Sequence, residues 1–133
     1  TLPGVSQSLI ITRMEGKTAV PPGESIESFA SHQASMAIYL SSGMIEELSK
    51  RLLTGGYEKD TPAAIVYKAT WPDEKAFVCT VGTLGETARE NEITRLAVVL
   101  VGDVVKHQHY QKSKLYDADW ETEYRSAKSG QNR

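Results

Sequence analysis

Residues 60–75 constrain the fold more than any other stretch, because they encode two strands and the tight turn between them. Residues 63–67 form an apolar, partly β-branched run, which predicts a buried strand. Pro72 then stands where a tight turn favours its fixed φ, and a second strand follows at once, so the two strands must form an antiparallel hairpin. Ala69 and Thr70, at the exit of the first strand, let a ligand approach the backbone closely. The stretch therefore predicts one rim of a binding cleft.

The rest of the chain alternates between strand and helix patterns. Strands are expected at 8–14, 35–40, 62–69, 75–81 and 96–101. Helices are expected after a cap at Ser25, over about 43–54, and over 83–91, where Thr83 and Glu86 have the spacing of a capping box. The order β-α-β-α-β-β-α-β predicts an α/β fold, a mixed sheet of about five strands flanked by helices.

The segment over about 43–54 has the clearest helical pattern. Met44, Leu48 and Leu52 recur at intervals that place them on one face. Acidic residues precede basic ones by four positions elsewhere on the helix, which stabilises it. Gly55 and Gly56 then end it.

Two strand ends are expected to lie at one edge of the sheet. The helix over 43–54 connects the strands 35–40 and 62–69, so this unit predicts a right-handed crossover between parallel strands. Ligands of open α/β sheets bind outside the carboxyl ends of strands, which here fall near Leu40 and Ala69. The continuous apolar run over 96–101 predicts a central strand covered on both faces.

Composition and charge exclude several classes of protein. The 133 residues are 40% hydrophobic and 24% charged, which is ordinary for one globular domain. A net charge of −2 and no dense basic run argue against a nucleic-acid partner. No apolar stretch is long enough for a membrane span, and no signal peptide is visible. The single cysteine, Cys79, excludes an internal disulfide and favours the cytoplasm.

No set of side chains in the sequence specifies a reaction. His107 and His109 lack a third metal ligand, and no serine stands in a pattern that supports a nucleophile. Arg13, at the end of the first strand, is either a surface charge or an anion clamp. Trp71 either packs on its own hairpin or forms a rim for a planar ligand. Composition and spacing therefore predict no more than an α/β domain with a cleft over residues 1–105, followed by an irregular tail over 106–133.

Several segments resemble the C-terminal half of the tetrapyrrole methyltransferases. They are residues 1–13 (TLPGVSQSLIITR), the Tyr-Leu-Ser-Ser step at 39–42, residues 60–75 (DTPAAIVYKATWPDEK) and residues 113–117 (SKLYD). The Asp-Thr-Pro-Ala-Ala and Val-Gly-Asp-Val-Val pieces are general to that family. The YKATWPDE and SKLYD segments are similar to the branch that methylates carbon 11 of precorrin-4 or cobalt-precorrin-4 in cobalamin synthesis.

The resemblance implies a methyltransferase that uses S-adenosylmethionine and releases S-adenosylhomocysteine. Its members are homodimers of two-domain chains, with the cofactor between the domains and the tetrapyrrole in a trough beside it. The family pattern assigns cofactor contacts to Leu40 and Ala69, with Thr70 as a further candidate, and leaves the reaction without an acid–base pair. Arg13 is the candidate for pairing with the carboxylates of the substrate. The two strand ends chosen from topology are thus the two that the resemblance also selects.

The family's glycine-rich N-terminal domain has no counterpart in this sequence, and the chain opens on Thr1 without an initiator methionine. The expectation is an isolated C-terminal domain that is inactive by itself, lacks its N-terminal partner domain, and self-associates through the apolar surface left bare. Three alternatives remain open. They are another tetrapyrrole methyltransferase (acting on uroporphyrinogen III or another precorrin), a ribosomal-RNA or diphthamide-pathway relative, and a non-catalytic binding or dimerisation module.

Overall fold

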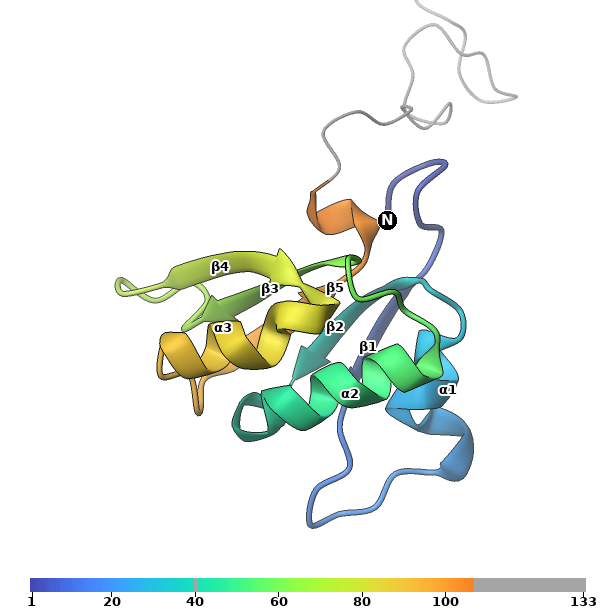
Figure 1. Ribbon diagram of the computed structural model, residues 1–133, viewed down its shortest axis with the longest axis horizontal. Helices are drawn as coiled ribbons and strands as arrows, with labels where there is room; N and C mark the ends of the chain where they lie inside the picture. Colours follow the sequence, from blue (N-terminus) through green and yellow to red (C-terminus); the bar gives the residue numbers. More distant parts are fainter. Residues whose placement is uncertain (40, 107–133) are drawn as a thin grey trace, which may run out of the picture.

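A computed structural model describes residues 1–39 and 41–106. Its strands and α-helices occur in the predicted order (Figure 1). They are β1 (Leu9–Arg13), α1 (Ile26–Ala30), β2 (Ser35–Tyr39), α2 (Ile45–Gly55), β3 (Pro62–Tyr67), β4 (Lys75–Thr80), α3 (Leu84–Glu90) and β5 (Ala97–Val101). Short 3₁₀ turns at Pro22–Glu24, Ser42–Met44, Val81–Thr83 and Asp103–Val105 complete the described part.

The five strands form one mixed sheet in the order β1-β2-β5-β3-β4. β1 and β2 are parallel, whereas β5 runs antiparallel to both of its neighbours, β2 and β3. β2 and β3 therefore point the same way, as predicted, and their carboxyl ends lie at one edge of the sheet. The prediction did not place β5 between them. β3 and β4 form the predicted antiparallel hairpin.

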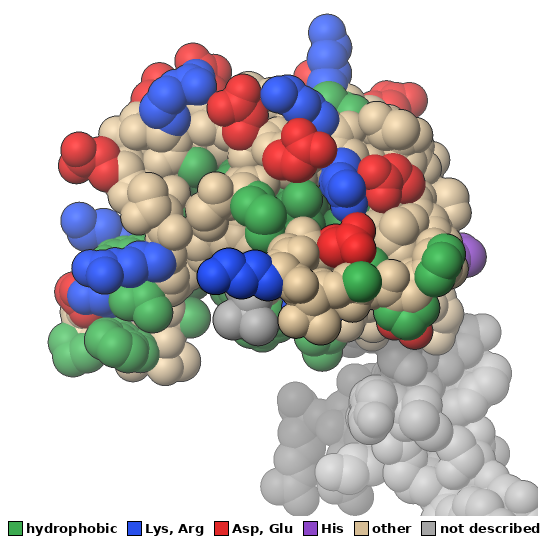
Figure 2. All heavy atoms as spheres, turned by 90° about the horizontal axis from the view of Figure 1, so that it is seen from below, with side chains coloured by type: hydrophobic (Ala, Val, Ile, Leu, Met, Phe, Trp, Pro, Cys, Tyr) green, Lys and Arg blue, Asp and Glu red, His purple; other side chains and the backbone are tan. Residues whose placement is uncertain are grey.

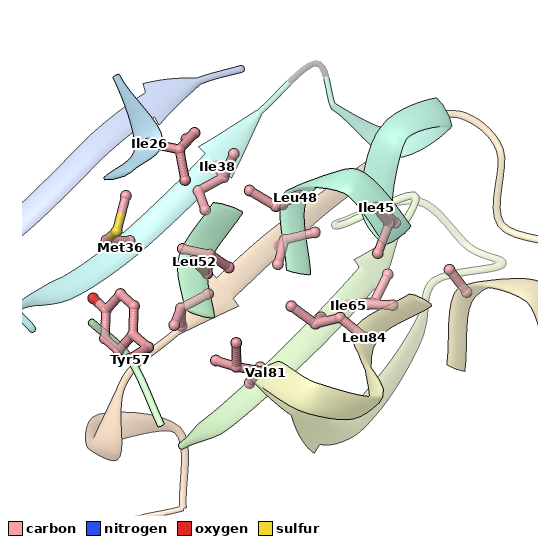
Figure 3. Packing of buried hydrophobic residues seen from close by; sticks show 14 of the residues in the cluster. Ile26, Met36, Ile38, Ile45, Leu48, Leu52, Tyr57, Ile65, Val81 and Leu84 are labelled. Atoms are coloured by element: carbon pink, nitrogen blue, oxygen red, sulfur yellow. The ribbon is translucent and has the colours of Figure 1, made fainter. Parts of the chain in front are cut away.

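The three α-helices lie together on one face of the sheet (Figure 1). The core lies between these helices and the sheet. It contains fully buried side chains from both layers, among them Ile38, Leu48, Ile65 and Leu84 (Figure 3). Burial of these side chains stabilises the packing of the helices on the sheet, by about 25 cal/mol for each Å² of apolar surface removed from water. β5 is the central strand of the sheet, as predicted, but among the described residues helices cover only one of its two faces.

The opposite face of the sheet is a row of apolar side chains. In register across the strands it reads Ile11, Ala37, Leu100, Ala64 and Val78. Within residues 1–39 and 41–106 no helix packs on it, and Ile11 and Val78 at its two ends are 67% and 58% exposed. We call this side of the sheet, opposite the helices, the open face.

The helix predicted over about 43–54 is confirmed in its inner face, its ion pairs and its end. Ile45, Leu48 and Leu52 are buried, and Met44, in the turn just before α2, packs against the core. Glu46 pairs with Lys50, and Glu47 with Arg51, at i,i+4 spacing. Gly56 ends the helix at φ +125°, a conformation open to glycine because it has no Cβ.

One predicted helix cap is confirmed and the other is wrong. The Ser25 hydroxyl accepts a hydrogen bond from the amide of Ser28 at 3.1 Å, which caps α1. Thr83 makes no such bond at the start of α3, so the capping box with Glu86 does not form. Thr83 instead completes a box with Thr80 around the preceding 3₁₀ turn. The hydroxyl of Thr83 is used by this turn, which begins at Val81, two residues before the predicted start of the helix at 83.

Tyr57 fastens the end of α2 to the start of β2 through its hydroxyl, which donates to the carbonyl oxygen of Ala34. Burial, reinforced by the nearby Asp103 carboxylate, raises the pKa of Tyr57 from its ordinary value of about 10 to about 12. The folded state thus favours the protonated phenol.

A pH-dependent contribution to stability follows from that shift. The stabilisation by Tyr57 is fully present below the unfolded-state pKa and is lost as pH rises from about 10 to about 12. We expect the difference in free energy of unfolding between the wild type and Tyr57→Phe to shrink by about 2 kcal/mol over that interval. Denaturant titrations of both proteins at a series of alkaline pH values measure it, and a difference that stays constant would contradict the assignment.

The tail predicted over 106–133 lies outside the described residues apart from Lys106, and so do His107 and His109. In the described part, no helix is both long and apolar enough to cross a membrane.

Candidate functional site

A cavity of about 300 Å³ opens where β2 and β3 end. Its walls come from the end of β2, the exit of β3 and the start of β5, the three segments that the antiparallel course of β5 brings to one edge. The lining residues are Tyr39, Ser42, Val66, Lys68, Ala69, Trp71, Leu96, Ala97 and Val98. Val66 and Val98 extend the cavity onto the open face, so its floor is apolar.

A larger hollow of about 490 Å³ lies at the opposite edge, before β1 and β2, and includes His32 and Phe29. We place the functional site in the smaller cavity, because ligands of open α/β sheets bind outside the carboxyl ends of strands. The smaller cavity also contains Ala69, which the sequence selected.

The turn that forms one wall of the cavity is held in a strained conformation. Lys68 and Thr70, on either side of Ala69, have φ of +46° and +72°. Leu96, on the facing wall, has φ of +56°, and its carbonyl oxygen accepts a hydrogen bond from the amide of Lys68 at 2.8 Å. Non-glycine residues at positive φ cost about 1 kcal/mol or more each and persist where neighbouring contacts enforce them. The backbone of this wall is therefore fixed before any ligand arrives.

Hydrogen bonds within the turn account for that rigidity. The amide of Trp71 donates to the carbonyl of Lys68, and the amide of Glu74 donates to the carbonyl of Trp71, with Pro72 at the second position as predicted. The amide of Thr70 donates to the Glu74 carboxylate at 2.5 Å. None of the bonds among the described residues uses the amide of Ala69, which leaves this group available to a ligand.

Lys68 is the one charged side chain among the described residues that line the cavity. Its ammonium lies 2.5 Å from the Asp73 carboxylate and 5.3 Å from the ring centres of both Tyr67 and Trp71. The hydrogen bond between Lys68 and Asp73 raises the pKa of the lysine and lowers that of the aspartate. Both groups are therefore charged at neutral pH.

Two serines connect the strand ends beneath the cavity. The Ser41 hydroxyl accepts from the amide of Met14 at 3.0 Å and donates to the carbonyl of Tyr39 at 2.9 Å. Ser42 does the same for β5, accepting from the amide of Ala97 and donating to its carbonyl. Both hydroxyls thus substitute for strand pairing where the ladders have ended, a role that the sequence did not indicate.

We expect Ser41→Ala to lower the free energy of unfolding by about 1–3 kcal/mol, because it leaves the buried amide of Met14 without a partner. Chemical denaturation measures the change. Ser31→Ala is the matched control, since its exposed hydroxyl bonds only one carbonyl at the end of α1. Equal effects of the two substitutions would contradict the role given to Ser41.

The structure brings some of the predicted site residues together and separates others. Ala69 lines the cavity, whereas Thr70 does not. Leu40 lies outside the described residues, although Tyr39 and Ser42 on either side of it line the cavity. The guanidinium of Arg13 donates to the carbonyls of Met14 and Thr18, so it holds the loop after β1 and is not part of the cavity lining.

The sequence missed Lys68 and the three lining residues at the entry to β5, of which Leu96 directly precedes the strand. Lys68 directly precedes Ala69 and could have been noted as the charge nearest the predicted rim. Leu96, Ala97 and Val98 gave no such signal, because the start of a strand reaches this edge only if the strand is antiparallel. No cluster of three potential metal ligands occurs in the described part of the chain.

The model of the family described as tetrapyrrole (corrin/porphyrin) methylases matches residues 1–85. The cobalt-precorrin-4 C(11)-methyltransferase of Methanocaldococcus jannaschii is 44% identical over 96% of this chain and 49% of its own length. The protein of the same name from Priestia megaterium is 40% identical over 88% of this chain and 46% of its own. The chain thus spans about half the length of these relatives.

Solved structures agree with the sequence comparisons. The X-ray structure of a cobalt-precorrin-4 methyltransferase superposes with a TM-score of 0.77 and 39% identity, over 80% of this chain and 45% of that one. A uroporphyrin-III C-methyltransferase from Thermus thermophilus, in complex with S-adenosylhomocysteine, shares the fold at a TM-score of 0.65 and 19% identity, over 80% of this chain and 46% of that one. The resemblance inferred from the sequence is confirmed: the chain belongs to the tetrapyrrole (corrin/porphyrin) methylase family.

Proposed function

We propose that this chain forms part of an S-adenosylmethionine-dependent methyltransferase that acts on carbon 11 of precorrin-4 or cobalt-precorrin-4 in cobalamin synthesis. The observation that carries the proposal is the 44% identity over 96% of the chain to a cobalt-precorrin-4 C(11)-methyltransferase. The cavity at Ala69 supports it, because it opens at the strand ends where a ligand of an open α/β sheet is expected to bind. We place the reaction in the cytoplasm, where a free thiol such as that of Cys79 persists.

The residues of the cavity fit part of S-adenosylmethionine. Ala69 is small and offers an amide that no described residue uses, and Val66 and Val98 give an apolar floor. Ala69, Leu40 and Thr70 remain our candidates for cofactor contacts. The cofactor supplies a methyl group already activated on a sulfonium, and this chain contributes a rigid wall that orients it and excludes water. No general acid or base is required of this half.

The rest of the cofactor site is proposed to lie on the half of the relatives that this chain does not match. The 133-residue chain by itself is then expected to show no methyl transfer, and robust turnover would contradict this.

The proposal is tested with a chimera in which this chain replaces the matched half of the M. jannaschii relative. With S-adenosylmethionine and cobalt-precorrin-4, we expect a product heavier by one methyl group, with the new methyl on carbon 11 by NMR. Uroporphyrinogen III is offered in parallel. Methylation of uroporphyrinogen III alone would replace the proposed substrate, and a folded chimera that methylates neither would overturn the proposal.

We also propose that the protein is a homodimer and that the open face contributes to the contact. The face is apolar across all five strands, and Ile11 and Val78 at its ends are well exposed. Val78→Glu is expected to shift the protein toward the monomer in light scattering, because a charge would be buried in the interface. Glu47→Lys on α2 serves as the control. A wild type that is strictly monomeric at high concentration would contradict the proposal.

A further inference from the structure

Three large apolar side chains surround the mouth of the cavity, and we call Tyr39, Trp71 and Leu96 the rim. They are 48%, 54% and 50% exposed, so each presents about half of its surface to water. Single exposed hydrophobic residues are common, but three around one opening form a contiguous surface that favours a ligand. Figure 2 shows hydrophobic side chains with Lys or Arg beside them at its lower left, the end where Figure 1 places the β3–β4 turn.

The cavity itself is too small for a whole macrocycle. At about 300 Å³ it has the size of a site for part of a small molecule. A ligand that uses the rim therefore lies across the mouth and not inside the cavity. Trp71 offers it the largest flat apolar surface of the three, on a turn whose backbone is already fixed by hydrogen bonds.

The charge at the mouth selects the chemistry of that ligand. The Lys68 side chain is 21% exposed and its ammonium lies 5.3 Å from the centre of the Trp71 ring, so the side chain is held at the rim. Its partner Asp73 is 56% exposed and can be exchanged for another carboxylate. A cation fixed beside an exposed indole matches a flat ring that carries carboxylates. The sulfonium of the cofactor, being a cation, gains nothing from Lys68.

We propose that Trp71 and Lys68 are specificity-determining residues for the tetrapyrrole substrate. The ring plane lies on the indole of Trp71, a peripheral carboxylate pairs with the ammonium of Lys68, and Asp73 competes with that carboxylate. The inference rests on the proposed function, since it assigns substrate contacts to the same site. It further states that Asp73 weakens binding, so that removing its charge improves the affinity.

Porphyrin binding to the 133-residue chain tests the inference. The probes are uroporphyrin and coproporphyrin, which has the same ring and half as many carboxylates, and binding is followed by the absorbance and fluorescence of the porphyrin. We expect Trp71→Ala to weaken both porphyrins about tenfold, as loss of one stacking partner does, and Trp71→Phe to retain most of the affinity. Lys68→Met should weaken uroporphyrin about fivefold and coproporphyrin less, because fewer carboxylates reach the position.

The Asp73→Asn variant gives the sharpest result. We expect it to bind uroporphyrin about threefold more tightly than the wild type, with a steeper dependence on salt, because the ammonium is freed for the ligand. Lys50→Met and Glu46→Gln are the matched controls, since these residues form an exposed ion pair on α2. Thermal unfolding of each variant confirms that the fold is intact.

The outcomes separate this inference from the proposed function. Affinities of the Trp71, Lys68 and Asp73 variants equal to wild type would overturn the inference, and so would a wild type that binds neither porphyrin. In both cases methyl transfer by the chimera still decides the proposed function. If the porphyrin affinities change as expected but the chimera shows no methyl transfer, the proposed reaction is overturned. Trp71 and Lys68 then remain as a porphyrin-binding element.

Discussion

Gly55→Ala is expected to lower the free energy of unfolding by about 3 kcal/mol, the upper part of the range for an overpacked contact. A Cβ at Gly55 would lie 2.5 Å from the Cβ of Ala30 and 2.7 Å from the carbonyl oxygen of Glu27. Both neighbours belong to α1, and backbone atoms cannot rotate away as a long side chain does. The helices must separate, which opens the core beneath them. This loss exceeds the gain of about 1 kcal/mol that alanine brings to an ordinary helix position.

Gly23→Ala is the matched control for that experiment. A Cβ at Gly23 meets nothing within 4 Å, and its φ lies outside the left-handed region. We expect a change of no more than about 0.5 kcal/mol, as for most surface substitutions. Urea denaturation of both variants gives the comparison. A Gly55→Ala protein as stable as wild type would show that α1 and α2 are not in such close contact.

Ala69→Phe is expected to reduce kcat/KM of the chimera at least about a hundredfold, as displacement of a bound reactant by about 1 Å can do. The larger side chain fills the part of the cavity against which the cofactor is proposed to lie. The turn cannot move to make room, because Lys68 and Thr70 on either side are held by hydrogen bonds. Ala69→Ser, which keeps the residue small, should retain most of the activity.

Thr54→Phe is the control for Ala69→Phe, since it adds a ring at an exposed position of α2. Methyl transfer and calorimetric titration with S-adenosylhomocysteine are measured on each chimera. Activity and affinity of Ala69→Phe close to wild type would remove Ala69 from the cofactor site. Loss of activity with unchanged affinity would assign it to the substrate instead.

Local patterns in the sequence predicted the elements well, because helices and strands depend on near neighbours. The stripe of α2, its ion pairs, the stop at Gly56 and the turn at Pro72 are all confirmed. Ser25 caps α1 as predicted. The error at Thr83 arose because two overlapping signals compete for one hydroxyl, and only the geometry of the chain decides between them.

The candidate site was predicted in part. Ala69 follows from a strand that ends in small residues, a property of sequence alone. Lys68 and Leu96 belong to the site because their backbones adopt positive φ and bond to each other, and neither residue type indicates this. Arg13 had the right charge at the right strand end, yet its guanidinium is engaged by the loop after β1.

Local patterns along the chain were enough to predict the order of elements, the hairpin around Pro72, the shared direction of β2 and β3, and the family. These depend on periodicity, turn chemistry and motifs that a single chain carries. Three features became visible only in the folded chain: β5 lies between β2 and β3, the helices occupy one face, and Leu96 to Val98 complete the cavity. The physical reason is that strand order is set by long-range backbone pairing. An apolar run such as 97–101 can pair equally well with any neighbouring strand until the whole core is packed.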